Sequence, residues 1–252
     1  MLLVADIGNT SINIGLFEDE ALVDQFRLAS DKDLSQEEYE VLLKSLCSKY
    51  NIDGCIIGSV VTELNKKFKS SVDNVFKINS LLLNSTFNTG VKLALDNNNE
   101  AGADRIANAC AAYALYNKPC IVVDFGTATS FDIVNKDGEF IGGIIAPGLN
   151  LQLKVLNKFT SKLPHLDVAV SPFAIGSNTT DAILSGVIRG SACMIEGLIN
   201  QCEAELKEKA IVVATGGYSS ILENYMTRKF DFINPTLTLS GLRFLYMLNS
   251  KD

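Results

Sequence analysis

Apolar and polar positions alternate in two stretches of this chain, one at the N-terminus and one near its middle. The first reads LLVADIGNTSINIGLFEDEAL, and the second, which begins near residue 120, reads CIVVDFGTATSFDIVNKDGEF. In both stretches, a run of apolar, β-branched residues ends in Asp-x-Gly and is followed by a turn rich in hydroxyl residues. A second run of alternating residues comes next, and an acidic turn then leads to a third run. The pattern predicts one β-meander used twice, with Asp6 equivalent to Asp124 and Gly8 to Gly126.

Apolar residues at helical spacing follow each predicted meander. SQEEYEVLLKSLCSKY follows the first, and the stretch from Asn178 to about Lys207 follows the second. Between them, AGADRIANACAAYALY is rich in alanine and stops at Asn117-Lys118-Pro119, which predicts a further helix. CIIGSVV, IVVATGG and TLSGLRFLYMLN supply additional strand and helix elements.

This order of elements predicts an α/β protein with two similar lobes packed around a cleft. A chain of 252 residues suits two modest lobes. We place the boundary after the alanine-rich helix, so that the lobes comprise residues 1–117 and 118–252.

Charge and hydropathy narrow the classes of partner. The chain has 22 Lys and Arg against 29 Asp and Glu, a net charge of −7, without a long basic run. This balance argues against nucleic acid and anionic membranes as partners. The opening MLLVADIGNT lacks a positive segment, and we interpret the later apolar runs as shorter than a spanning helix requires. We therefore expect a cytoplasmic protein.

Cysteine and histidine offer little for catalysis. The six cysteines form no CxxC pair, and His165 is the single histidine, so a zinc site has little material. Cys110 and Cys120 lie in apolar stretches, where we expect them to pack as small, reduced hydrophobic residues. We assign His165 no role.

The Asp-x-Gly turns bring a carboxylate and several backbone N–H groups to the end of a buried strand. Glycine allows close approach of an anion, the turn amides and Thr10 can donate to phosphate oxygens, and Asp6 can hold Mg²⁺ through water. A plain Asp-Gly turn would give the same local pattern. Two copies at equivalent places favour nucleotide binding.

The ordered motifs resemble a known family. DIGNT, DFGTAT and VVATGG are similar to the two phosphate motifs and the adenosine motif of the superfold of actin-like ATPases, sugar kinases and heat-shock ATPases. More narrowly, the chain resembles the type III pantothenate kinases, in which the same motifs recur in the same order: DIGNTSINIGLF, GADRIANA, VVDFGTATSFD, GGIIAPGL, IGSNTTDAILSG, ATGG and LTLSGL. Together they span nearly the whole chain, and GADR between the two turns separates this family from most of its superfold relatives.

The resemblance implies an actin-like ATPase (ribonuclease H-like) fold in both lobes. It also implies transfer of the γ-phosphoryl group of ATP to pantothenate, the entry step of coenzyme A biosynthesis, with Mg²⁺, a monovalent cation (K⁺ or NH₄⁺) and a homodimer. Two departures concern pantothenate binding: Leu95 stands where the family usually has Tyr, and a Pro common in that loop is missing from DNNNEAGADR.

The resemblance makes Asp104 the candidate base, because a carboxylate near the acceptor hydroxyl can orient it and accept its proton. Asp104 follows Gly102-Ala103 at the start of a helix, where the helix dipole favours the ionised form. An N-cap role is the alternative, and the two can coexist. Arg105 would bind a substrate carboxylate or the transferring phosphoryl group, or else form a surface ion pair.

The remaining site residues are carried over from the same resemblance. The first phosphate loop comprises Asp6, Ile7, Gly8, Asn9, Thr10, Ser11, Ile12 and Asn13. Thr127 is an expected ATP contact, and Asp124 an expected ligand of the monovalent cation. The expected pantothenate contacts are Gly102, Ala103, Asp104, Arg105 and Thr179. Thr179 suits a carboxylate at a helix N-terminus, although an N-cap role fits equally. Gly216 and Gly217 would admit adenine or ribose, or form a tight strand-to-helix turn.

Two other functions stay open on the sequence. One is a kinase for a sugar or acetate, or a polyphosphate phosphatase, within the same superfold. The other is an ATP-binding regulatory or filament-forming protein without small-molecule kinase activity. Asp104 and Arg105 speak against the second, because a nucleotide clamp needs no carboxylate on the acceptor side.

Overall fold

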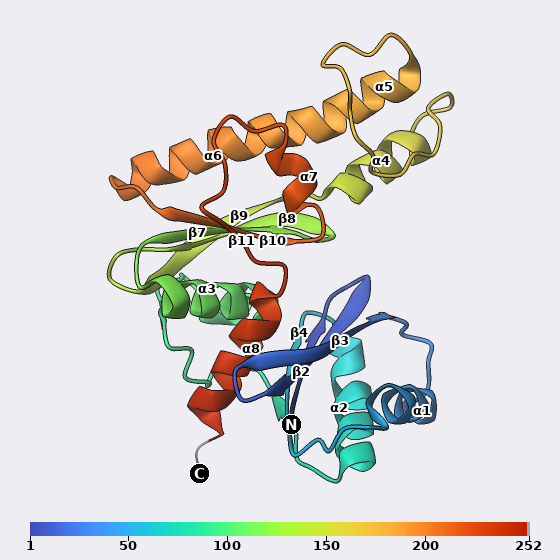
Figure 1. Cartoon of the computed structure of the whole chain (residues 1–252), viewed down its shortest axis with the longest axis vertical. Helices are drawn as coiled ribbons and strands as arrows, with labels where there is room; N and C mark the ends of the chain where they lie inside the picture. Colours follow the sequence, from blue (N-terminus) through green and yellow to red (C-terminus); the bar gives the residue numbers. More distant parts are fainter. Residues whose placement is uncertain (251–252) are drawn as a thin grey trace. The chain divides into compact units, whose positions relative to one another are not determined.

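The chain forms two compact units in the computed structural model, which describes residues 1–250 (Figure 1). The first unit comprises residues 1–115 together with the C-terminal stretch from Leu237, and the second comprises Tyr116–Thr236. The compact units therefore differ from our division into lobes of 1–117 and 118–252 in the C-terminal helix. We placed this helix in the second lobe, whereas it belongs to the first compact unit.

The first unit is built on a five-stranded sheet of order β3-β2-β1-β4-β5. Its strands are β1 (Leu2–Ile7), β2 (Ser11–Glu18), β3 (Ala21–Ala29), β4 (Gly54–Ser59) and β5 (Leu81–Leu82). The other elements are α1 (Gln36–Cys47), α2 (Thr62–Phe76), the short strand β6 (Lys92–Leu93), the 3₁₀ turn η1 (Asn98–Glu100), α3 (Ala103–Tyr116) and α8 (Leu237–Asn249). One apolar core joins the sheet to α1 and α2, and a second joins it to α3 and α8.

The second unit repeats this sheet, with strands in the order β9-β8-β7-β10-β11. They are β7 (Cys120–Phe125), β8 (Ala128–Val134), β9 (Glu139–Pro147), β10 (Ile211–Gly216) and β11 (Phe232–Ile233). The helices are α4 (Leu149–Lys158), α5 (Thr179–Leu184), the π-helix η2 (Ser185–Arg189), α6 (Gly190–Leu206) and α7 (Ser219–Glu223).

The predicted repeat of the β-meander is confirmed by strand pairing. β1, β2 and β3 pair antiparallel, as do β7, β8 and β9, and β1 and β7 each take a parallel partner on the other side, β4 and β10. Asp6 therefore lies between Asn13 and Gly58, as Asp124 lies between Ser130 and Thr215. Each Asp-x-Gly motif ends the central strand of its own sheet.

Helix α1 shows how local sequence sets an element boundary. The Ser35 hydroxyl accepts a hydrogen bond from the Glu38 amide at 3.2 Å, while the Glu38 carboxylate accepts one from the Ser35 amide at 2.8 Å. This capping box satisfies two first-turn donors. Tyr39, Leu43 and Cys47, at intervals of four, form the buried face.

The long helix after the second meander is also confirmed, as α5, η2 and α6 in continuous succession. Our expectation that apolar stretches are too short to span a membrane does not hold for it: among the described residues, Thr179–Leu206 is long and apolar enough by length and composition. Half of the apolar window is buried inside the protein, as in a core helix, with Ile188, Ile195 and Ile199 in the core.

Helix α8 packs closely on α3 and on the first sheet. A side chain at Gly241 would collide with the Ala107 carbonyl, and a Cβ at Gly58 would lie 2.7 Å from Leu242. Glycine at these positions thus lets α3, α8 and β4 approach one another. This packing places the C-terminal helix in the first unit.

The buried cysteines confirm the expected structural role. Cys110 and Cys120 are 1% and 0% exposed, and burial raises the pKa of both thiols to about 12. A thiolate at neutral pH is thereby strongly disfavoured.

Candidate active site

The first Asp-x-Gly turn divides its residues between core and surface. Ile7 and Ile12 are fully buried in the core beside α1 and α2, so only their backbone groups can face a nucleotide. Asn9 and Thr10 are exposed at the tip of the turn. The Gly8 amide donates to the Ser11 carbonyl at 3.0 Å and closes the turn.

Ser30, just after β3, fastens this turn from the side. Its hydroxyl donates to the Gly8 carbonyl at 2.5 Å, and its amide donates to the Thr10 carbonyl at 3.2 Å. The two bonds direct these carbonyl oxygens towards β3. Sequence reasoning missed Ser30, although the meander register, which pairs Ser11 with Ala29, could have pointed to it.

Asp6 presents a half-buried carboxylate at the end of β1. Its Oδ2 accepts a hydrogen bond of 3.2 Å from Asn13 Nδ2 on the neighbouring strand. The described residues contain no cluster of three or more His, Cys, Asp and Glu side chains that could hold a metal. A single carboxylate nevertheless fits Mg²⁺, which usually keeps several waters and binds through one or two carboxylates and substrate phosphates.

Asp104 lies near the carboxyl ends of β1 and β4, within the first unit. Val60, which follows β4, donates its amide to the Ile7 carbonyl at 3.0 Å, and a Cβ at Gly102 would lie 3.2 Å from the Val60 side chain. Ala103 in turn faces Gly58, the strand partner of Asp6. The structure thus brings the GADR segment to the same sheet edge as the first phosphate turn.

Asp104 sits inside the first turn of α3, which begins at Ala103, so the residue before the helix is Gly102 and the N-cap interpretation does not apply to Asp104. Its Oδ1 accepts the Arg105 amide at 2.8 Å. Burial raises the pKa of the Asp104 carboxyl, and the backbone hydrogen bonds and the Arg105 charge only partly oppose it. Desolvation is thus the largest influence on this carboxyl, and it acts against the ionised form that the helix N-terminus favours.

The second Asp-x-Gly turn is enclosed by two glycines from distant motifs. A Cβ at Gly148, from GGIIAPGL, would lie 2.5 Å from the carbonyl oxygens of Gly126 and Thr127. Gly216, from ATGG, has φ of +85°, and its Cβ would lie 2.6 Å from the Phe125 carbonyl. Three motifs therefore meet at the end of β7, and both glycines are required by close backbone approach.

A side-chain bridge links two of these motifs. Asn150 Nδ2, in the first turn of α4, donates to the Tyr218 hydroxyl at 2.6 Å, and Tyr218 directly follows Gly217. No local pattern could have indicated this pair, because the two residues are 68 positions apart. Asp124 is half-buried and Thr127 is exposed at this turn.

Thr179 is the exposed first residue of α5, which projects beyond the sheet of the second unit (Figure 1). Asn178 caps this helix: its side chain accepts the Asp181 amide at 2.9 Å. The N-cap alternative therefore belongs to Asn178, and the Thr179 hydroxyl is not the cap.

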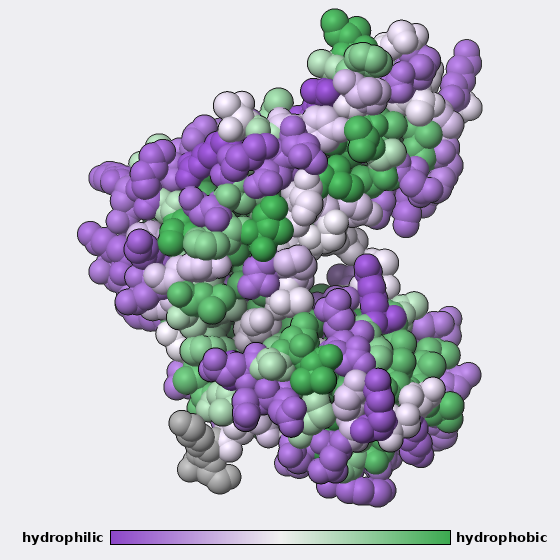
Figure 2. Space-filling model, viewed as in Figure 1, coloured by the Kyte–Doolittle hydropathy of each residue, from purple (hydrophilic) through white to green (hydrophobic). Residues whose placement is uncertain are grey.

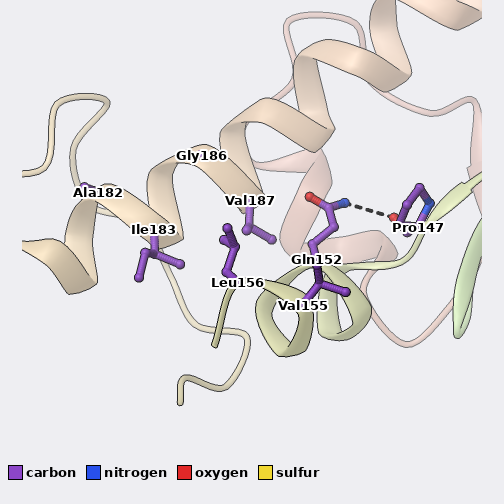
Figure 3. A pocket seen from close by; sticks show the side chains of 8 residues that line it. All are labelled: Pro147, Gln152, Val155, Leu156, Ala182, Ile183, Gly186 and Val187. Carbon is purple, nitrogen blue, oxygen red and sulfur yellow. Dashed lines mark hydrogen bonds between the residues drawn. The ribbon is translucent and has the colours of Figure 1, made fainter. Parts of the chain in front are cut away.

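A groove of about 440 Å³ lies between α4 and the α5–η2 segment (Figure 3). Its lining is mostly apolar, and its polar member, Gln152, donates to the Pro147 carbonyl at 2.9 Å. Apolar side chains also gather on the surface over α4 and α5 (Figure 2). The residues that line the groove are Pro147, Gln152, Val155, Leu156, Ala182, Ile183, Gly186 and Val187. No residue of the two Asp-x-Gly motifs is among them.

Solved structures share the fold of this chain. A Campylobacter jejuni protein of the Baf family has a TM-score of 0.62 at 22% identity, with 97% of each chain covered. A ROK family glucokinase from Streptomyces griseus, in complex with glucose and AMPPNP, has a TM-score of 0.52 at 13% identity, covering 96% of this chain and 98% of that one. At these identities the likeness shows the fold. Together with the repeated sheet and the paired Asp-x-Gly turns, it defines an actin-like ATPase fold, as predicted.

Sequence comparison identifies the family. The profile of the type III pantothenate kinases matches residues 2–201. A type III pantothenate kinase of Dehalococcoides mccartyi (strain CBDB1) is 44% identical over 98% of this chain and 96% of its own, and one of Roseiflexus sp. (strain RS-1) is 41% identical over 99% of both. The chain belongs to the type III pantothenate kinase family.

Proposed function

We propose that this chain transfers the γ-phosphoryl group of ATP to the primary hydroxyl of pantothenate, giving ADP and 4′-phosphopantothenate, the first step of coenzyme A biosynthesis. The observation that carries the proposal is the placement of Asp104 beside the carboxyl end of β1, where Asp6 and the first phosphate turn lie. A phosphotransferase needs the carboxylate that orients the acceptor hydroxyl to lie close to the turn that binds the phosphates.

Asp104 orients the acceptor hydroxyl and takes its proton as the bond between the γ-phosphorus and the β–γ bridging oxygen breaks. Arg105 binds the substrate carboxylate or the transferring phosphoryl group. Gly102, Ala103 and Thr179 complete the pantothenate contacts. The half-buried Leu95, in place of the usual Tyr, removes a hydroxyl from this set.

Backbone amides of the first Asp-x-Gly turn, other than the Gly8 amide that closes it, bind the phosphates together with the exposed side chains of Asn9 and Thr10. Asp6, whose carboxylate accepts a hydrogen bond from Asn13, would hold Mg²⁺, and the ion would supply neutralisation of the phosphate charge. At the second turn, Thr127 contacts ATP. Asp124 would bind K⁺ or NH₄⁺, for which a carboxylate with nearby carbonyl oxygens is a suitable site.

A second copy of the chain completes the functional unit as a homodimer. Large apolar side chains stay exposed on the second unit, among them Phe159, Phe173 and Ile175, which are 74%, 64% and 89% exposed. Apolar patches of this kind mark interaction surfaces. The net charge of −7 supports a cytoplasmic enzyme that acts without nucleic acid or membrane partners.

The experiment that tests the function is a coupled assay of ADP release with ATP, Mg²⁺ and a panel of acceptors, with mass spectrometry of the product. We expect phosphopantothenate only when ATP and pantothenate are both present. Turnover of a hexose or acetate instead would favour another small-molecule kinase of this fold. ATP binding without turnover of any acceptor would favour the regulatory alternative.

A further inference from the structure

Asn108 is a fully buried polar residue in the alanine-rich helix α3. Its neighbours on the helix, Ala107, Ala109, Ala111 and Ala112, are at most 2% exposed. A buried amide in such surroundings is costly unless it is hydrogen-bonded, and Asn is also a poor helix former. A specific contact must therefore offset this cost.

That contact comes from the other end of the chain. Thr238, in the first turn of α8, donates its hydroxyl hydrogen to Asn108 Oδ1 at 2.8 Å, across 130 positions of sequence. Three residues later on the same helix, Gly241 admits the backbone of Ala107. The bond therefore lies inside a tight helix–helix contact, where the motif LTLSGL, so far without a role, meets the helix that begins with GADR.

Asn108 is one helical turn beyond Asp104 and lies on the same side of α3. The first turn of the helix is also fixed at Ala103, which faces Gly58. A hydrogen bond one turn further along restricts both rotation and sliding of α3. Such movements would displace the Asp104 carboxylate, and misplacement of a reacting group by about 1 Å can reduce a rate about 100-fold.

We propose that Thr238 and Asn108 form a positioning pair, in which the hydrogen bond between helices α8 and α3 fixes the place of the Asp104 carboxylate at the acceptor hydroxyl. The inference rests on the role proposed above for Asp104. Neither residue needs to touch a substrate. Their effect is on the orientation of the base and not on the binding of ATP.

The test is the substitution Thr238→Val, which keeps the shape of the side chain and removes the hydroxyl. We expect kcat to fall about 10-fold, part of the effect of a misplaced base, with the KM for ATP unchanged. Thr238→Ser, which restores the donor, should recover most of the rate. Thr238→Ala serves as a second variant if Val disturbs folding, and all assays are run well below each variant's Tm.

The matched control is Ser71→Ala on α2. The Ser71 hydroxyl is equally engaged, donating to the carbonyls of Lys67 at 2.9 Å and Gln36 at 3.1 Å, and the residue is fully buried. Loss of the Ser71 hydroxyl should lower Tm about as much as Thr238→Val does. It should leave kcat within about twofold of the wild type, because Ser71 does not position Asp104. Equal kcat losses in Thr238→Val and Ser71→Ala would overturn the proposal.

A double variant separates the inference from the proposed function. In an Asp104→Asn background, Thr238→Val should cause little further loss, because residues that act through one group are non-additive. A full additional 10-fold loss would refute the positioning pair and leave Asp104 as the base. Wild-type turnover by Asp104→Asn alone would refute the base itself, and with it the pair.

Discussion

Asp104→Asn is the change that most directly tests the site. The substitution removes the negative charge and the ability to accept a proton, and it keeps the size of the side chain. Loss of a positioned general base lowers rates by about 10²- to 10⁴-fold. We expect kcat to fall at least about 100-fold, which corresponds to about 2.7 kcal/mol of lost transition-state stabilisation.

The same variant should not lose stability. The asparagine oxygen can still accept the Arg105 amide that Asp104 Oδ1 accepts at 2.8 Å. Burial raises the pKa of the Asp104 carboxyl in the folded protein, so the ionised form is disfavoured by folding and destabilises the protein at neutral pH. This destabilisation is absent at pH values below the unfolded pKa of about 4, and it is absent from the Asn variant at every pH. We therefore expect an unchanged or raised Tm at pH 7.

The measurement combines steady-state kinetics with thermal unfolding of the wild type and the variant. Asp104→Glu, which keeps a carboxylate but moves it, is the matched control and should retain part of the rate. The raised pKa of Asp104 further predicts that, as the pH is lowered, the kcat of the wild type begins to fall at a higher pH than for a carboxyl with an ordinary pKa. The pH profile of the Asn variant should lack this fall. Normal turnover with a Tm lowered by several degrees would mean that Asp104 is only structural.

Three further outcomes are expected. Asp124→Asn should abolish the rise in activity when K⁺ replaces Na⁺ at fixed Mg²⁺; equal wild-type rates in both salts, or rescue of the variant by added Mg²⁺ alone, would contradict the cation site. Glu203, whose side chain is 5% exposed, accepts hydrogen bonds of 2.8 Å from Arg228 and pairs with Lys209. The hydrogen bonds from Arg228 are the main cause that lowers the pKa of Glu203 to about 2. Glu203→Gln should therefore reduce the free energy of unfolding at pH 7 by about 3 kcal/mol. That contribution is complete above pH 4.5 and lost as the pH falls towards 2, so urea unfolding at pH 7 and pH 2 should show the difference between wild type and variant only at the higher pH. Ile175→Glu should shift the mass measured by light scattering towards the monomer of 27.3 kDa, and an unchanged dimer would exclude this surface as the interface.

Local pattern alone determined much of the fold. Alternating residues, two Asp-x-Gly turns and acidic hairpins predicted both meanders, because strand pairing between neighbours depends on residues close in sequence. The alanine-rich run and its Asn-Lys-Pro stop predicted α3 to within two residues at its start. The order of the motifs was also sufficient to indicate the family, because each motif is a short stretch of consecutive residues.

Only the tertiary structure shows which of these motifs contact one another. The tie from Ser30 to the first phosphate turn, the Asn150–Tyr218 bridge and the Thr238–Asn108 bond join residues 22, 68 and 130 positions apart. The side of the molecule on which α8 packs depends on glycines that leave room for a neighbour, a property visible only once the neighbour is in place. The pKa of Asp104 is likewise raised by burial, which outweighs the lowering by the backbone hydrogen bonds at the start of its helix. Contacts of this kind depend on how separate elements pack, which no local pattern of side chains encodes.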